Sequence, residues 1–112
     1  MSAEHREVYR TIGTPNMQHF YVYILKCSDN SYYTGHTDNI DYRISAHKKG
    51  KACAYTATRL PVEVVFVQEF AERIEALEAE MMIKKWSRKK KEALIAENWD
   101  LLKFLSKKVF KK

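Results

Sequence analysis

The sequence has little of what staples or anchors a protein. Its two cysteines, Cys27 and Cys53, lie far apart and form no CxxC pair, which favours a reduced cytosolic protein over a disulfide-rich secreted one. No apolar run approaches roughly 18 residues, the length that a membrane helix needs, and charged residues near the N-terminus would interrupt a signal peptide. These absences predict a cytoplasmic protein with no membrane partner.

Several widespread catalytic and metal-binding motifs are also missing. The chain has no glycine-rich phosphate loop, no HExxH pair and no spacing of histidine and cysteine typical of a zinc finger. No internal repeat is present. The sequence therefore gives no support for a P-loop nucleotide site or a common zinc site.

What the chain does have is basic charge on the length of a single domain. Its 112 residues are 46% hydrophobic, enough for one modest core, and the formal net charge is +6. This charge favours a polyanionic partner, and nucleic acid fits it better than a membrane interior. Charge alone is weak support, because many lysine-rich faces bind only water.

The first half of the chain predicts a leader, a hairpin and a helix. Residues 1–17 are polar and without periodicity, which indicates a flexible leader before a domain over residues 18–112. Alternating apolar residues predict strands over residues 20–26 and 32–36. A helix follows, capped by Asp38 or Asn39 and ended by Gly50, and residues 51–60 are expected to form a basic loop.

The second half predicts a strand and three helices. The β-branched run over residues 62–70 indicates a third strand, which we expect at the centre of the sheet. A long helix is expected over residues 71–86, and shorter ones after Ser87 and Asn98. The predicted core residues are Ile24, Ile44, Val64, Phe66, Leu77 and Leu94.

One helical stripe carries polar residues toward the interior. Ile40, Arg43, Ile44 and His47 are spaced so that all four share a helix face, which points the arginine and histidine into the core or a cleft beside it. In the simpler interpretation the arginine reaches the rim and the histidine is a core residue with satisfied hydrogen bonds.

The long helix raises the same question for its acidic residues. Glu78 and Glu80 both border apolar positions, and periodicity does not choose between them. A solvated acid paired with lysine is the simpler interpretation of either. Together, phenols, a guanidinium, an imidazole and a carboxylate form a set suited to phosphodiester cleavage, because they can hold a divalent cation, neutralise phosphate and relay a proton.

These residues occur in motifs that resemble the GIY-YIG nuclease domain. The matching stretches are YVY at residues 21–23, YTG at 33–35, GHTDNIDYRISAH at 35–47 and ALEAEMMIKK at 76–85. The resemblance covers about residues 19–105 and is strongest to small stand-alone bacterial members. The chain departs from the family motif at Tyr21 and Val22, and SRKKKEAL has no asparagine where several members place one.

The resemblance implies a fold, an activity and a site. The fold is α/β, with a small three-stranded antiparallel sheet in ββαβα order, flanked by helices and extended by further C-terminal helices. The activity is that of an endonuclease dependent on Mg²⁺ or Mn²⁺ that hydrolyses DNA, including branched or damaged DNA in repair or recombination. The metal ligand is Glu80 rather than Glu78, and the catalytic residues are Tyr23, Tyr33, Arg43, His47 and Glu80.

Two features of this site depend on geometry. A two-residue loop at Asp29 and Asn30 would send Tyr23 and Tyr33 to opposite faces of the sheet, whereas an odd-length loop or a bulge would put both on one face. The resemblance makes Tyr23 the proton acceptor. Because the pKa of free tyrosine is near 10, that role requires cationic neighbours or a relay to a better base, and His47 is the competing base.

Nucleic-acid binding is assigned to basic residues outside the catalytic set. The expected phosphate-contacting residues are Lys48, Lys49, Lys51, Arg59, Lys89, Lys90 and Lys91. Three alternatives stay open: a binding module that lost the chemistry, a subunit whose protein partner selects the substrate, and a structural protein with no nucleic-acid role.

Overall fold

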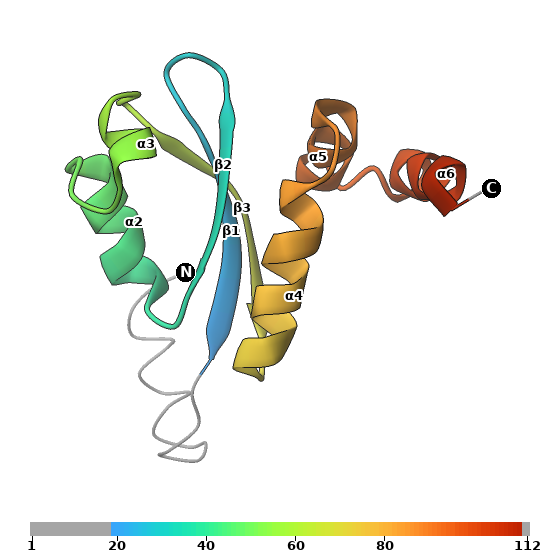
Figure 1. Ribbon diagram of the computed structural model, residues 1–112, viewed down its shortest axis with the longest axis horizontal. Coiled ribbons are helices and arrows are strands. Elements are labelled where there is room, and N and C mark those ends of the chain that lie inside the picture. Colours follow the sequence, from blue (N-terminus) through green and yellow to red (C-terminus); the bar gives the residue numbers. More distant parts are fainter. Residues whose placement is uncertain (1–18, 111–112) are drawn as a thin grey trace.

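The computed structural model describes residues 19–110, with side chains through residue 105. The predicted leader over residues 1–17 lies outside the described residues. Figure 1 shows a small sheet with helices on both of its faces. Across the described part, no helix is long and apolar enough to cross a membrane.

The sheet is antiparallel and has three strands: β1 (Phe20–Lys26), β2 (Tyr32–Thr37) and β3 (Glu63–Phe70). Their order is β2-β1-β3, so β1 is central. The prediction that the third strand is central is wrong. Helices cover β1 on both faces and leave most of its side chains buried, whereas β3 lies at an edge and is mostly half-buried or exposed despite its β-branched residues.

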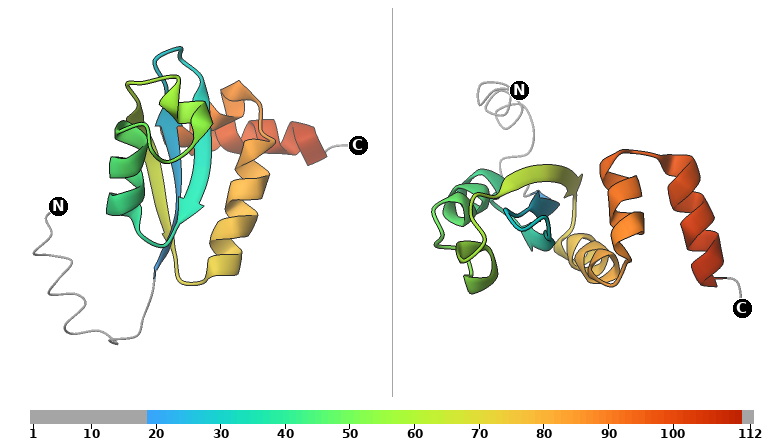
Figure 2. Two further views of the ribbon diagram at one scale, coloured as in Figure 1. Left: turned by 60° about the vertical axis from the view of Figure 1, so that its left-hand side comes forward. Right: turned by 90° about the horizontal axis from the view of Figure 1, so that it is seen from above.

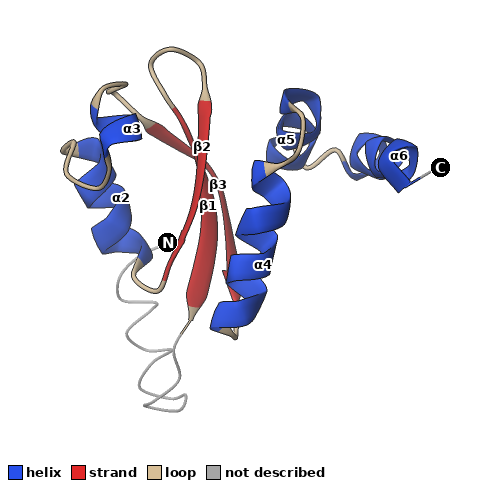
Figure 3. Cartoon of the chain, in the orientation of Figure 1, coloured by secondary structure: helices blue, strands red, loops and turns tan. Residues whose placement is uncertain are grey.

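Two groups of helices flank the sheet (Figures 1 and 3). On one side lie α2 (Ile40–Lys48) and the short α3 (Ala54–Ala57), which forms inside the segment expected to be a loop. On the other side lie α4 (Arg73–Lys84) and α5 (Arg88–Ile95). Helix α6 (Trp99–Phe110) lies beyond α5, at the end of the molecule farthest from α2 (Figure 2).

The helix boundaries follow the capping residues expected from the sequence. The backbone N–H of Tyr42 donates to the Asn39 side chain over 3.1 Å, and Gly50 follows α2 at a φ of +74°, a conformation that glycine adopts readily. Ser87 caps α5 and Asn98 caps α6 in the same way. These three helices therefore begin where their capping side chains predict.

Each face of the sheet has its own apolar cluster. Toward α4 and α5 the cluster contains Val22, Ile24 and Leu94, and toward α2 it contains Tyr23 and Leu25. Among the predicted core residues, Ile24 and Leu94 are buried, Ile44, Val64 and Phe66 pack against the clusters while partly exposed, and Leu77 is partly buried. Alternating side chains on β1 thus divide the core between two layers.

The β1–β2 hairpin has an odd-length loop. Cys27 donates its backbone N–H to Ser31 over 2.9 Å, which leaves residues 28–30 as the loop, and Asn30 adopts a φ of +70°. In the resulting register Tyr23 pairs with Gly35. Since Tyr33 lies two residues before Gly35, Tyr23 and Tyr33 point to the same face, as the sequence required for a shared site.

Candidate active site

A buried hydrogen-bond chain joins β1, α2 and α3. The Tyr23 hydroxyl lies 2.8 Å from Nε2 of His47, and Nδ1 of His47 lies 2.8 Å from the Thr56 hydroxyl. All three residues are buried, and His47 is fully inaccessible. The helical stripe in the sequence correctly carried His47 inward, but Thr56 was missed, because its role depends on where a four-residue helix folds back against α2.

Gly35 leaves room for the Tyr23 ring. A Cβ atom at this position would lie 2.6 Å from the Tyr23 hydroxyl oxygen and 2.8 Å from Cζ, far inside an ordinary contact. The ring therefore lies directly against the backbone of β2. This close approach explains, for this chain, why YTG ends in glycine.

Tyr33 completes an aromatic cluster on the same face. Its ring centroid lies 5.1 Å from that of His47 and 6.4 Å from that of Tyr23. On its other side it meets the ring of Tyr55 at 5.9 Å in a stacked orientation. The structure thus brings Tyr23, Tyr33 and His47 together in one cluster.

Arg43 lies at the rim of this cluster. It is partly buried on α2, and its charge acts on the ionisation of Tyr23, Tyr33 and His47. Within the part of the chain whose side chains are described, its guanidinium has no hydrogen-bond or ion-pair partner. A cation so placed is free to meet an anionic group of a ligand.

Glu80 reaches the site around the edge of the sheet. It extends from α4, is 8% exposed, and contacts Nδ1 of His36 with one carboxylate oxygen and Nζ of Lys84, at 2.9 Å, with the other. His36 pairs with Val22 on β1, so its side chain points to the face opposite Tyr23. Because β2 is an edge strand, the Glu80 charge still acts on Tyr23 and Tyr33.

Glu78 and His36 differ from what the sequence alone could assign. Glu78 is exposed and lines a separate groove with Phe70 and Met82, away from the tyrosines. His36 was missed as a neighbour of Glu80. Strand alternation could have placed it on the α4 face, but only once the register of the hairpin was known.

The comparison with known proteins decides the family. The family model of the GIY-YIG catalytic domain matches residues 19–93, more than half of the 112-residue chain and the whole of the candidate site. The chain belongs to the GIY-YIG family. The resemblance inferred from the motifs is confirmed.

Relatives of this GIY-YIG chain are small bacterial proteins. The UPF0213 protein YazA of Bacillus subtilis is 46% identical over 79 residues, which cover 70% of this chain and 79% of YazA. The UPF0213 protein SH2523 of Staphylococcus haemolyticus is 47% identical over 81 residues, 72% of this chain and 99% of the relative. The latter thus consists almost entirely of the matching domain.

A solved structure supports the GIY-YIG fold. The solution NMR structure of the protein EF2693 from E. faecalis matches with a TM-score of 0.52 at 34% identity, over 77% of this chain and 91% of that protein. The expected antiparallel sheet flanked by helices, with additional helices at the C-terminal end, is therefore confirmed.

Burial sets the protonation states in this GIY-YIG site. It raises the pKa of Tyr23 far above its ordinary value, and it raises the pKa of Tyr33 to about 12, with the Cys53 thiol adding to the effect. Burial, followed by the charge of Arg43, lowers the pKa of His47. At neutral pH the site therefore holds two protonated phenols and a neutral imidazole.

The donor atoms at Glu80 limit which metal could bind. Among the described residues, no group of three or more histidine, cysteine, aspartate and glutamate side chains could enclose a metal ion. Mg²⁺ needs no such cage, because it usually keeps several waters and binds through one or two carboxylates. A single carboxylate at the edge of the sheet fits a hydrated Mg²⁺ or Mn²⁺ ion better than zinc.

The predicted basic residues do not form one surface. Lys48 and Lys49 are exposed at the end of α2, with Lys51 just beyond, while Lys89 is exposed on α5 across the sheet. Lys90 is only 5% exposed and lies over the Trp86 ring at 4.4 Å, so its predicted phosphate contact is wrong. A lysine is buried here because its charged group packs on an aromatic face.

Proposed function

We propose that this protein is a metal-dependent endonuclease that hydrolyses DNA phosphodiester bonds, with branched or damaged DNA as a candidate substrate. The observation that carries the proposal is the buried hydrogen bond between the Tyr23 hydroxyl and His47. It gives a phenol that is itself a poor base a neutral acceptor for its proton.

The proton moves along the Tyr23–His47 pair. Nδ1 of His47 donates its hydrogen to the Thr56 hydroxyl, an assignment that leaves Nε2 free to accept from Tyr23. As Tyr23 takes a proton from the attacking water, it passes its own proton to Nε2. His47 then carries the positive charge, and Tyr23 stays neutral throughout. This relay resolves the competition between the two candidate bases by using both.

Arg43 and Tyr33 act on the phosphate and the water. The guanidinium of Arg43, without a partner among the described side chains, would share the charge that develops on the nonbridging oxygens. Tyr33 lies between His47 and Tyr55 with its phenol protonated, so it can donate a hydrogen bond that orients the attacking water.

Glu80 is the residue that would hold a divalent cation. Its contacts with His36 and Lys84 fix the carboxylate at the edge of the sheet, beside the tyrosines. A cation bound there would polarise a phosphate oxygen and stabilise the leaving oxygen.

A cleavage assay on a panel of branched, nicked and single-stranded DNA, with Mg²⁺ or Mn²⁺, tests the proposal. We expect metal-dependent cleavage of at least one substrate, slowed about a hundredfold or more in Arg43→Ala. Absence of cleavage on every substrate with either ion would contradict the proposal.

One observation favours a second function, that of a nucleic-acid-binding module without chemistry. Both carboxylate oxygens of Glu80 already have basic partners, His36 and Lys84, as in a structural ion pair. This alternative predicts DNA binding without cleavage and no calorimetric signal for Mn²⁺. The cleavage panel and an Mn²⁺ titration distinguish the two functions.

A further inference from the structure

Three planar groups lie in succession beside the candidate active site. The Tyr33 ring stacks on the Tyr55 ring, and the Arg59 guanidinium lies 3.8 Å from the Tyr55 centroid. Because the guanidinium already covers one face of Tyr55, Tyr33 packs against the other. The order from site to surface is therefore Tyr33, Tyr55, Arg59, and the Arg59 side chain is 33% exposed.

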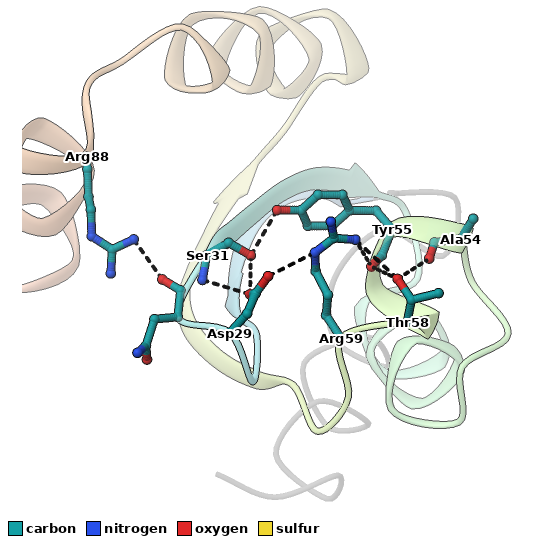
Figure 4. A network of polar contacts seen from close by, with 8 residues as sticks. Asp29, Ser31, Ala54, Tyr55, Thr58, Arg59 and Arg88 are labelled. Atoms are coloured by element: carbon teal, nitrogen blue, oxygen red, sulfur yellow. Dashed lines mark hydrogen bonds and ion pairs between the residues drawn. The ribbon is translucent and has the colours of Figure 1, made fainter.

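The outer two groups are held rigidly in place, as Figure 4 shows. Nε of Arg59 donates to Asp29 over 3.0 Å, and Nη1 donates to the Tyr55 carbonyl over 2.9 Å. The Tyr55 hydroxyl donates to Ser31 over 2.8 Å. These bonds tie α3 to the hairpin loop and fix the plane of the guanidinium parallel to its aromatic support.

We propose that the outer face of the Arg59 guanidinium, supported by Tyr55 and Tyr33, stacks an unpaired nucleobase of the substrate. The inference rests on the proposed nuclease function and specifies its substrate class. Aromatic rings and arginine planes are the surfaces on which proteins stack splayed-out bases. A base inside a duplex has both faces covered by neighbours, so only a single-stranded or frayed nucleotide can use this surface.

The geometry favours base stacking over the phosphate contact predicted from the sequence. The positive charge of Arg59 is paired with Asp29, and two of its three nitrogens already have acceptors. What Arg59 offers to solvent is therefore mainly a flat face. The stack ends at Tyr33, whose ring lies 5.1 Å from that of His47, so a base held on Arg59 lies beside the bond to be cut.

The test is a binding titration with a fluorescent single-stranded DNA of about 12 nucleotides, in EDTA so that no cleavage occurs. Each nucleotide in turn is replaced by an abasic residue. We expect one position at which the loss of the base weakens binding to the wild type about fivefold or more. Arg59→Lys, which keeps the charge but loses the plane, should bind the intact DNA as weakly as the wild type binds that abasic DNA, and should be insensitive to the abasic residue.

Tyr55→Phe is the matched control, since it keeps the ring and loses only the bond to Ser31, and it should retain the sensitivity to the abasic residue. If Arg59→Gln lowers the salt slope by about 0.7 and leaves that sensitivity intact, Arg59 contacts phosphate and the inference is wrong. A wild-type protein that is indifferent to every abasic position, or that binds no single strand, also overturns it. Cleavage with an indifferent wild type would leave the nuclease proposal standing. Base sensitivity without cleavage would have the opposite meaning.

Discussion

Replacing Gly35 with alanine should break the Tyr23–His47 pair without touching either residue. The new Cβ would lie 2.6 Å from the Tyr23 hydroxyl, whereas an ordinary contact begins at 3.4 Å. The hydroxyl must therefore move by about 0.8 Å, and a 2.8 Å hydrogen bond does not survive that movement unless His47 moves with it. Overpacking of this kind costs about 1–3 kcal/mol of folding free energy.

Gly50→Ala is the matched control. Gly50 has a φ of +74°, so alanine there is strained and also costs about 1–2 kcal/mol, but its Cβ meets only Leu60 and Ala57. Urea unfolding should show similar losses for both variants. Only Gly35→Ala should lose cleavage and change the ¹⁵N shift of the His47 ring. If the two variants keep equal activity and equal His47 shifts, the close contact is not what positions Tyr23.

Three further predictions follow from the site. Calorimetry should show that Glu80→Ala loses Mn²⁺ binding while Glu78→Ala and Arg43→Ala keep it; loss only in Glu78→Ala would place the metal in the other groove. Because the folded-state pKa of His47 is depressed, the unfolded chain binds its proton first, so stability falls as the pH drops below about 6.5. The stability advantage over His47→Gln in urea should therefore narrow toward acid pH, and a constant gap would refute the burial effect. The log–log slope of duplex binding against salt should fall by about 0.9 per lost contact when three lysines become glutamine, with Lys89→Gln as the single-site comparison; an unchanged slope would move the binding face elsewhere. The three are Lys48, Lys49 and Lys51.

Local signals predicted the elements of this fold well, but not their order in the sheet. The first strand begins and ends where alternation indicated, and Asn39, Ser87 and Asn98 cap helices as expected. The position of β3 could not be inferred from its β-branched residues, because strand composition reports burial only indirectly. Its place at the edge follows from how α2 and α4 cover β1.

The site was predictable where it follows a period and unpredictable where it depends on tertiary contacts. His47 is carried inward by helical spacing, and the common face of Tyr23 and Tyr33 required only an odd loop, which Asn30 makes by adopting a positive φ. Thr56 and the stack on Arg59 have no periodic signal. They arise when a short helix packs against a hairpin loop distant in sequence.

The most direct test of the central claim is the single-turnover cleavage rate of Tyr23→Phe, measured on whichever DNA the wild type cleaves. Tyr42→Phe is the control, because Tyr42 is 71% exposed on α2 and loses the same oxygen atom. If the Tyr23–His47 pair relays the proton, Tyr23→Phe should cleave about a hundredfold or more slowly, while Tyr42→Phe matches the wild type. Equal rates in all three proteins would contradict the account.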